Sequence, residues 1–339
     1  GTYTFTGLTV GTTYYFKIYP YTGSSSTINY KTGAPVPQVT AATQGAGIYT
    51  WNGGNGDWTV STNWTPERTT PGVNDILQFS DGGTDTITGL IAETIGQLVI
   101  SNNTTVYLQA SAATVLTIGG LASGADLVVA AGSNLNVIGT GAITIALSSG
   151  ASGNIFGNMS MSSTASTAHR LTGYAASPIV SNSGSGFTCG LFMSGNVFGT
   201  TNLNSVIFTS GSTFYHQGGS NPFGASGTNS VVVFQTGSLY KVIGAVTPSL
   251  SGRTYADVEY AFNSNFNQSG GSAVSMDNLT VTLGNVNFNV TGTPGHKIKG
   301  NITVALGARL NFAPASPATV KLFGTTTQTI SGAGKITST

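Results

Sequence analysis

Charged side chains are scarce in this chain. Only 6% of its 339 residues are Asp, Glu, Lys or Arg, whereas a typical soluble domain contains about 25%. The 11 basic and 10 acidic residues leave a net charge of +1, and the sequence has no basic run or stripe. We therefore expect no nucleic-acid partner, because binding to a phosphate backbone requires clustered Lys and Arg.

Cysteine and long apolar runs are also nearly absent. Cys189 is the only cysteine, which excludes an intramolecular disulfide. No apolar stretch approaches the roughly 20 residues of a membrane-spanning helix, so we expect no membrane insertion. The opening "GTYTFTGLTV" has neither a charged nor an apolar signal-peptide region and no initiator Met. We expect the chain to be a mature or excised piece of a longer protein.

Glycine and small polar residues dominate what remains. The chain contains 48 Gly and is 39% hydrophobic, with short apolar runs separated by Gly, Ser, Thr and Asn. These small residues are weak helix formers and favour turns. The composition therefore predicts an all-β fold whose polar surface consists of hydroxyls and amides.

Internal repeats indicate the type of β fold. The segment 98–108 aligns with 127–137 at an offset of about 29 residues, and 206–215 aligns with 232–241 at about 26. A third pair, 278–288 and 301–312, is about 23 residues apart with one extra residue. Such offsets are typical of a β-solenoid with one turn per repeat. We predict a right-handed parallel β-helix over 75–339 with roughly ten coils.

Asparagine at predicted turns supports this interpretation. Asn102, Asn103 and Asn134 lie where the strands of the repeats meet. Asn tolerates the left-handed backbone conformation, and stacked Asn side chains can form amide ladders.

The first 32 residues have a different character, with dense alternating aromatics. The order Leu8, Gly11, Thr12, Tyr14 resembles the closing half of a fibronectin type III domain, which leads into the tyrosine-corner strand. We therefore expect 1–32 to contain the C-terminal strands of such a sandwich. Residues 33–47 are rich in Pro, Ala and Gly and are predicted to form a linker.

Residues 48–74 contain all three tryptophans, Trp51, Trp58 and Trp64, in the stretch "WNGGNGDWTVSTNW". One interpretation is a carbohydrate-binding platform, because indole rings stack on sugars. The other is a cap, because the first coil of a solenoid would otherwise expose its core and an unpaired strand edge. The position directly before the first repeats favours the cap.

Candidate metal ligands are few. The turn "SDGGTD" brings Asp81 and Asp85 together, and their oxygens could bind calcium. The nearby "GGNGD" is similar to a calcium-binding Gly-rich turn but occurs once. The histidines lack zinc spacing, and we expect them on the surface or in loops: His169, His216 and His296.

The motifs of common hydrolases and of P-loop proteins are missing. The one ionic cluster, "SGRTYADVEY", contains Arg253, Asp257 and Glu259. On a strand the two carboxylates share a face at about 6.5–7 Å, a spacing found in inverting glycosidases. An Arg–carboxylate pair that steadies a loop explains the cluster better, so we expect no enzyme.

The C-terminal repeats resemble those of large surface proteins of Bacteroidetes. The stretches "GNITVALGARLNFAP" (300–314) and "KLFGTTTQTISGAGKITST" (321–339) carry the similarity. The matching residues are Gly300, Ile302, Val304, Gly307, Ala308, Leu310, Gly324, Thr325, Gln328, Ile330, Gly332 and Gly334. The resemblance implies export by type IX secretion and display as adhesins or filaments. It also makes Thr86, in "DTI", a candidate O-glycosylation site.

Taken together, these features predict a noncatalytic stalk or adhesive module of an extracellular surface protein. Its expected partners are further copies, neighbouring modules of the same protein, or a cell-surface polysaccharide. The alternatives are a carbohydrate-binding module that uses the three Trp, and a polysaccharide-cleaving β-helix enzyme. The expected role needs no cofactor, although calcium is possible at Asp81 and Asp85.

Overall fold

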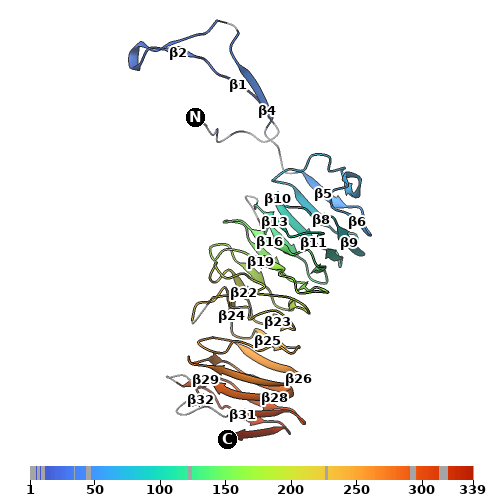
Figure 1. The fold of residues 1–339 in the computed structure, drawn as a ribbon, viewed down its shortest axis with the longest axis vertical. Coiled ribbons are helices and arrows are strands. Elements are labelled where there is room, and N and C mark those ends of the chain that lie inside the picture. Colours follow the sequence, from blue (N-terminus) through green and yellow to red (C-terminus); the bar gives the residue numbers. More distant parts are fainter. Residues whose placement is uncertain are drawn as a thin grey trace. The chain divides into compact units, whose positions relative to one another are not determined.

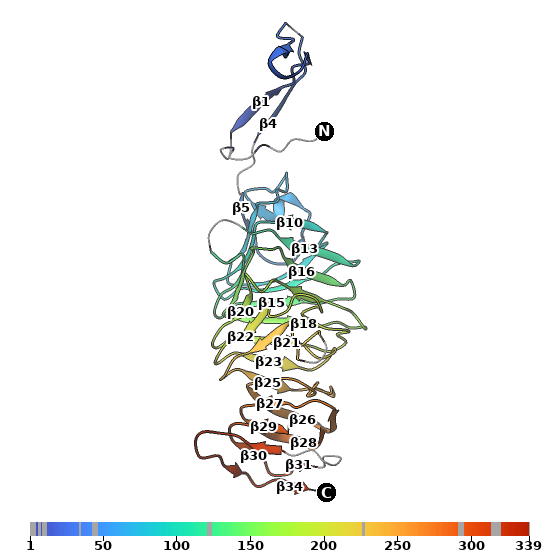
Figure 2. The ribbon, with the colours of Figure 1, turned by 90° about the vertical axis from the view of Figure 1, so that its left-hand side faces the viewer.

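The structure is a computed structural model of the chain (Figures 1 and 2). It describes Phe5, Leu8 and residues 12–33, 35–42, 47–120, 124–225, 228–290, 295–312 and 320–338. The chain divides into two compact units, Gly1–Gly47 and Ile48–Thr339. Each unit is described by itself below.

The first unit contains two small antiparallel sheets. Its elements are β1 (Thr13–Lys17) paired with β4 (Gln38–Ala42), β2 (Tyr21–Thr22) paired with β3 (Asn29–Tyr30), and the 3-10 turn η1 (Ser25–Thr27). Most of its described side chains are exposed, Tyr15 by 68%. These sheets are too small to confirm the fibronectin-like sandwich, which stays a prediction. Strand β4 lies inside the segment expected to be a linker.

The second unit is a parallel β-solenoid of about 11 turns, which confirms the predicted all-β, parallel β-helical architecture. Figure 1 shows the turns following one another from β5 to the C-terminus. Sheet I has nine strands: β5 (Ile48–Trp51), β7 (Trp64–Thr65), β8 (Ile76–Phe79), β11 (Gln97–Ile100), β14 (Leu127–Val129), β17 (Gly153–Ile155), β20 (Ile179–Ser181), β22 (Val206–Phe208) and β24 (Val232–Phe234).

Sheet II has 14 strands and is the longest. They are β6 (Gly56–Asp57), β9 (Thr84–Thr88), β12 (Thr105–Leu108), β15 (Asn134–Val137), β18 (Asn158–Met161), β21 (Gly186–Cys189), β23 (Thr213–His216), β25 (Leu239–Val242), β26 (Asp257–Gly270), β28 (Leu279–Val290), β30 (Ile302–Val304), β31 (Arg309–Phe312), β33 (Ile330–Ser331) and β34 (Lys335–Ser338).

Two shorter sheets complete the walls. Sheet III consists of β10 (Glu93–Ile95), β13 (Thr114–Ile118), β16 (Ile143–Leu147) and β19 (Arg170–Thr172). Sheet IV consists of β27 (Ser275–Met276), β29 (His296–Ile298) and β32 (Val320–Leu322). The helices of the described residues are η1 and a second 3-10 turn, η2 (Ser61–Asn63), and neither is long and apolar enough to cross a membrane.

The register of the stack confirms the three repeat alignments. Leu98 lies opposite Leu127 in sheet I, and Val106 lies opposite Leu135 in sheet II. The two later pairs follow the same rule: Val206 with Val232 and Thr213 with Leu239, and Leu279 with Ile302 and Val286 with Leu310. Since side chains alternate along a strand, this register places like residues above one another in the core.

The core changes in composition along the stack. Early turns bury aliphatic side chains such as Leu77, Leu98 and Leu127, all at most 1% exposed. Later turns bury stacked rings: Phe187, Phe198, Phe208, Phe214, Phe234, Tyr240 and Tyr255. Outer positions of sheet II carry amides and hydroxyls such as Asn134 and Ser160, whereas those of sheet I carry aliphatic side chains such as Val128 and Ile207.

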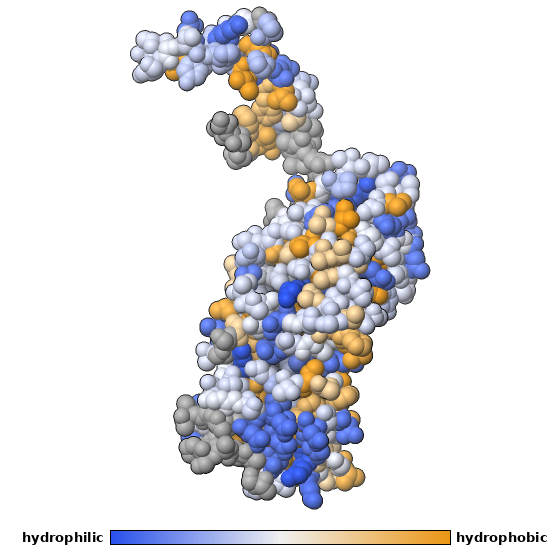
Figure 3. Space-filling model, viewed as in Figure 1, coloured by the Kyte–Doolittle hydropathy of each residue, from blue (hydrophilic) through white to orange (hydrophobic). Residues whose placement is uncertain are grey.

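The outer face of the C-terminal turns carries an amide ladder. Asn287 donates to Asn267 across 2.8 Å, Asn311 donates to Asn287 across 3.4 Å, and Thr337 donates to Asn311 across 2.8 Å. Figure 3 shows hydrophilic surface in this region, over β26, β28 and β31. A similar step joins Asn158 to the predicted ladder residue Asn134.

Among the described residues, sheet II is the one sheet that continues from the first turn of the solenoid to the last. Sheet III ends at β19 and sheet I ends at β24, while sheet II runs on through β25, β26 and β28. Sheet IV begins at β27 as a separate sheet. The sheets that form the walls therefore change around residues 243–256. Sheet II continues across this level.

Candidate functional site

The three tryptophans lie together at the first turn of the solenoid core. Trp51, Trp58 and Trp64 are 3%, 2% and 1% exposed. Trp64 meets the other two rings edge to face, with centroids 5.0 Å and 5.3 Å apart, and all three contact Phe79 of β8. The rings thus close the core rather than present a face to solvent.

The backbone of the same segment covers the edges of the first turn. Strand β7 pairs antiparallel with β5 at the edge of sheet I, and the two-residue β6 lies beside β9 at the edge of sheet II. The Trp64 indole N–H donates to the Trp58 carbonyl across 3.1 Å, which ties β7 to the turn after β6. An exposed edge would invite pairing with another chain, so this arrangement protects it.

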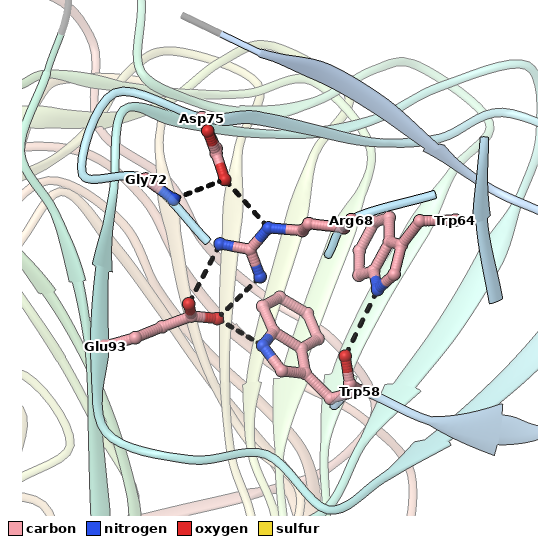
Figure 4. A network of polar contacts seen from close by, with 6 residues as sticks. All are labelled: Trp58, Trp64, Arg68, Gly72, Asp75 and Glu93. Carbon is pink, nitrogen blue, oxygen red and sulfur yellow. Dashed lines mark hydrogen bonds and ion pairs between the residues drawn. The ribbon is translucent and has the colours of Figure 1, made fainter. Parts of the chain in front are cut away.

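A buried ionic network completes the cap at sheet III (Figure 4). The Arg68 guanidinium pairs with Asp75 at 2.8 Å and with Glu93, the first residue of β10, at 2.9 Å. Asp75 also accepts from the Gly72 backbone N–H at 2.8 Å, and Glu93 accepts from the Trp58 indole. The arginine therefore links the cap segment to the top of sheet III.

The electrostatics of Arg68 are those of a fixed ion pair. Burial alone would lower its pKa, but Glu93 and Asp75 more than offset this, and the pKa of Arg68 is raised. Its side chain is 3% exposed, and it lies about 6 Å from the Trp64 and Tyr49 ring centroids. This geometry favours the cap interpretation of the Trp-rich segment over the sugar platform.

Asp81, Asp85 and Thr86 lie in and after the turn between β8 and β9. Asp85 is fully buried, Asp81 is exposed, and Thr86 is half-buried on the outer face. The turn contacts the cap loop, because Gly54 N–H donates to Asp85 and Thr86 N–H donates to Asn55. The structure therefore brings the two predicted metal ligands beside the Gly-rich loop that the sequence also singled out.

Asp257 and Glu259 share the outer face of β26, as predicted, but each has a local partner. Asp257 accepts from the backbone and the side chain of Asn278, at 3.1 Å and 2.7 Å. Glu259 pairs with Lys241 at 2.9 Å and accepts from Thr282 at 2.7 Å. These contacts connect neighbouring turns of sheet II.

The expected Arg253–carboxylate pair is wrong. The Arg253 guanidinium donates to the carbonyls of Asn229 and Ala225, and it lies 4.7 Å from the Phe223 ring centroid. Burial lowers its pKa, with Tyr255 acting in the opposite direction. Arg253 lies at the level where sheet I ends. Its guanidinium binds the carbonyls before the terminal strand β24 instead of a carboxylate.

The histidines were expected on the surface or in loops, but His216 lies in β23 and His296 in β29. His169 lies outside the strands as expected, and all three side chains are buried. His169 and His216 are 0% and 1% exposed, and His296 is 0% exposed. His169 Nδ1 accepts from Ile143 N–H at 3.0 Å, and His296 Nδ1 accepts from Val274 N–H at 3.2 Å. Both rings thus satisfy backbone donors of an adjacent turn.

His216 instead contacts a side chain, because its Nδ1 lies 2.5 Å from the Tyr240 hydroxyl. Burial lowers the pKa of His216 to about 4 and raises that of Cys189 to about 12. Both groups are therefore uncharged in the core at neutral pH.

Sequence reasoning missed Arg68, Asp75 and Glu93. Their segment is irregular, so no periodicity marks their side chains as buried. The low charge of the chain could have pointed to them. In a chain that is 6% charged, an arginine and two acids that follow the Trp-rich segment stand out as candidates for an ion pair. Across the residues that the structure describes, no three His, Cys, Asp or Glu side chains gather in a way that could hold a metal. Searches for similarity found no protein family, curated protein or solved structure that matches this chain.

Proposed function

We propose that the chain is a noncatalytic structural module, a stiff stalk or spacer in a large extracellular surface protein. The observation that carries this proposal is the continuous parallel strand pairing of sheet II from β6 to β34, around one packed core. Each turn donates backbone hydrogen bonds to the next and fixes its distance from it. Such a stack holds whatever lies at its two ends at a set separation.

The surface chemistry supports a role in assembly. A face of hydroxyls and amides with a net charge of +1 opposes close approach of further copies only weakly. We propose that the partners are such copies, neighbouring modules, or a cell-surface polysaccharide, and that the contacts are insensitive to salt.

The finer assignments belong to the same proposal. We expect the coils to be right-handed, because parallel crossover connections almost always are. We also propose that the first unit represents fibronectin-like strands, and that the protein is a Bacteroidetes-type surface adhesin or filament exported by type IX secretion. The order Leu8, Gly11, Thr12, Tyr14 supports the fibronectin-like assignment, and the resemblance of the C-terminal repeats supports the surface-protein assignment. Thr86 is the corresponding candidate for O-glycosylation.

The other two candidate functions have less support. The three Trp rings are buried, so a sugar could stack on them only after the cap opened. Asp257 and Glu259 are held by an amide and an ammonium group. A carboxylate in such a contact must first release its partner before it can act on a sugar.

The test is electron microscopy of cells that produce the protein, with gold-labelled antibodies against residues 48–339. We expect label on intact cells, along extended surface structures, in both low and high salt. Label confined to the cell interior, or compact dispersed particles, would contradict the proposal. A parallel assay for reducing or unsaturated sugar ends, with a Glu259→Gln control, would overturn the noncatalytic assignment if the wild type alone released them.

A further inference from the structure

Asp85 occupies a core position that the following turns fill with largely apolar side chains. In sheet II it lies opposite Val106, and Val106 lies opposite Leu135. Its exposed fraction is 0%. Placing a carboxylate where the next two turns have valine and leucine costs stability unless the charge is compensated.

The hydrogen bonds of Asp85 compensate only half of its carboxylate. Oδ1 accepts from the Gly54 backbone N–H at 2.5 Å. Oδ2 is buried and has no hydrogen-bond partner. Burial and the neighbouring charge of Asp81 raise the pKa of Asp85, while the bond from Gly54 acts in the opposite direction.

Asp81 brings a second carboxylate to the same loop. Its Oδ1 accepts from Gly83 N–H at 2.9 Å and from the Thr104 hydroxyl at 3.4 Å. Its Oδ2 lies so close to Gly53 and Gly83 that a Cβ added at either residue would be 2.8 Å away. Because Gly53 and Gly83 have no side chains, backbone atoms border this oxygen at both residues.

No positive side chain balances this pair. Asp81 and Asp85 border the consecutive residues Gly53 and Gly54, and the ion pairs found among the described residues involve neither carboxylate. The buried, unpartnered oxygen of Asp85, close to a second carboxylate, is therefore stabilised by a bound cation or by a proton.

We propose that Asp81 and Asp85 bind a calcium ion that fastens the cap loop at residues 52–57 to the turn between β8 and β9. Calcium fits because the donors are all oxygens and the flexible Gly-rich backbone can supply carbonyls, with water completing six to eight ligands. Magnesium requires a stricter octahedron, and zinc prefers the nitrogen and sulfur donors that this turn lacks.

The experiment is thermal unfolding of the whole chain at pH 7, in EDTA, in Ca²⁺ and in Mg²⁺, together with calorimetric Ca²⁺ titration. We expect Ca²⁺ to raise the Tm by about 5 °C or more, in a saturable manner and with one ion per chain, and Mg²⁺ to have a much smaller effect. Asp85→Asn should abolish the Ca²⁺ response. The matched control Asp277→Asn, in the turn between β27 and β28 far along the stack, should retain it.

The competing outcome is that a proton occupies the site. In that case Ca²⁺ changes nothing, and wild type without metal loses stability relative to Asp85→Asn as the pH rises above about 4, the ordinary value, because the folded-state pKa of Asp85 is raised. That result would overturn the proposal. If Asp85→Asn does not fold, Asp81→Asn at the exposed carboxylate provides the same test, and an unchanged Ca²⁺ response there would be equally decisive.

Discussion

At the scale of single residues, two buried arginines of this chain join segments that the sheets leave unconnected. Arg68 links the cap to sheet III through Glu93, and Arg253 holds a loop beside the last strand of sheet I. A buried ion pair adds little net stability compared with apolar residues of the same shape. Removing one partner is costly, however, because the other charge is left buried.

Replacing Arg68 with methionine should therefore destabilise the chain by about 3–5 kcal/mol, because Asp75 and Glu93 would lose their cation. Urea unfolding followed by tryptophan fluorescence reports on this directly, since the three Trp lie in the cap. The control is Lys299→Met, whose pair with Asp277 is 3.3 Å long and whose side chain is 47% exposed. Equal losses for the two variants would contradict the assigned role of Arg68.

The buried histidines make stability depend on pH. The folded-state pKa of His216 is about 4 and its unfolded-state value is about 6.5, so the unfolded chain binds the proton more tightly. Stability is then fully present above pH 6.5 and falls as the pH drops towards 4. We expect a loss of about 2 kcal/mol between pH 7 and pH 5 from this group. His169 acts in the same direction.

The measurement is the urea midpoint as a function of pH for wild type and His216→Gln. The variant should show a shallower decline below pH 6.5, even if its stability at pH 7 is lower because the Tyr240 hydroxyl has lost its partner. Parallel curves for the two proteins would show that His216 does not carry the effect.

At the scale of elements, side-chain ladders reinforce the backbone pairing of adjacent strands. In β26, β28 and β31 the outer amides repeat at the same register, so Asn287 both donates to Asn267 and accepts from Asn311. The long strands β26 and β28 thereby carry a second set of hydrogen bonds outside the core. Such bonds also fix the register, because a slip by one residue would break every step of the ladder.

Asn287→Ala should lower the unfolding free energy by about 1 kcal/mol, because it removes two hydrogen bonds that are partly exposed to water. Ser269→Ala on the same face, outside the amide ladder described above, should have a smaller effect. Chemical denaturation of both variants decides the point. A larger loss for Ser269→Ala would mean that the ladder contributes nothing beyond strand propensity.

The strands and their register could be predicted because the solenoid repeats its pattern. Gap-free alignments such as 98–108 with 127–137 place the same inward residues in successive turns, and the structure pairs them. The turn residues Asn102 and Asn103 adopt the left-handed conformation that the analysis ascribed to Asn, with φ of 55° and 60°. At these positions the conformation that each residue prefers is the one that the stacked turns require.

The predictions failed where residue type conflicted with position. His216 follows Phe214 at the inward spacing of β23, so the two-residue period alone would have placed it in the core. Its polar side chain was instead taken as a sign of exposure. Arg68 lies in a segment without periodicity, and its partners are 7 and 25 residues away. No sequence rule connects residues at those separations.

At the scale of the whole solenoid, each turn contacts mainly its neighbours, so one complete turn should be removable. Deleting 98–126 joins Gln97 to Leu127, and the register places β14 where β11 had been, beside β8. We expect the shortened chain to fold with parallel β structure and somewhat lower stability. Deleting 98–111 instead brings mismatched strands together and should prevent cooperative folding. Circular dichroism and thermal unfolding distinguish the two, and equal behaviour would contradict the repeat architecture.

The break in the walls of the solenoid has a mechanical consequence. A bundle whose walls all continue resists flexing in every direction, whereas a single ribbon flexes easily about its own plane. Between β24 and β27 the solenoid has one continuous sheet, sheet II. The hydrogen bonds from Arg253 to the carbonyls of Asn229 and Ala225 lie beside this level. Under a sideways load the stalk should therefore yield at this joint first, with the segments on either side remaining straight.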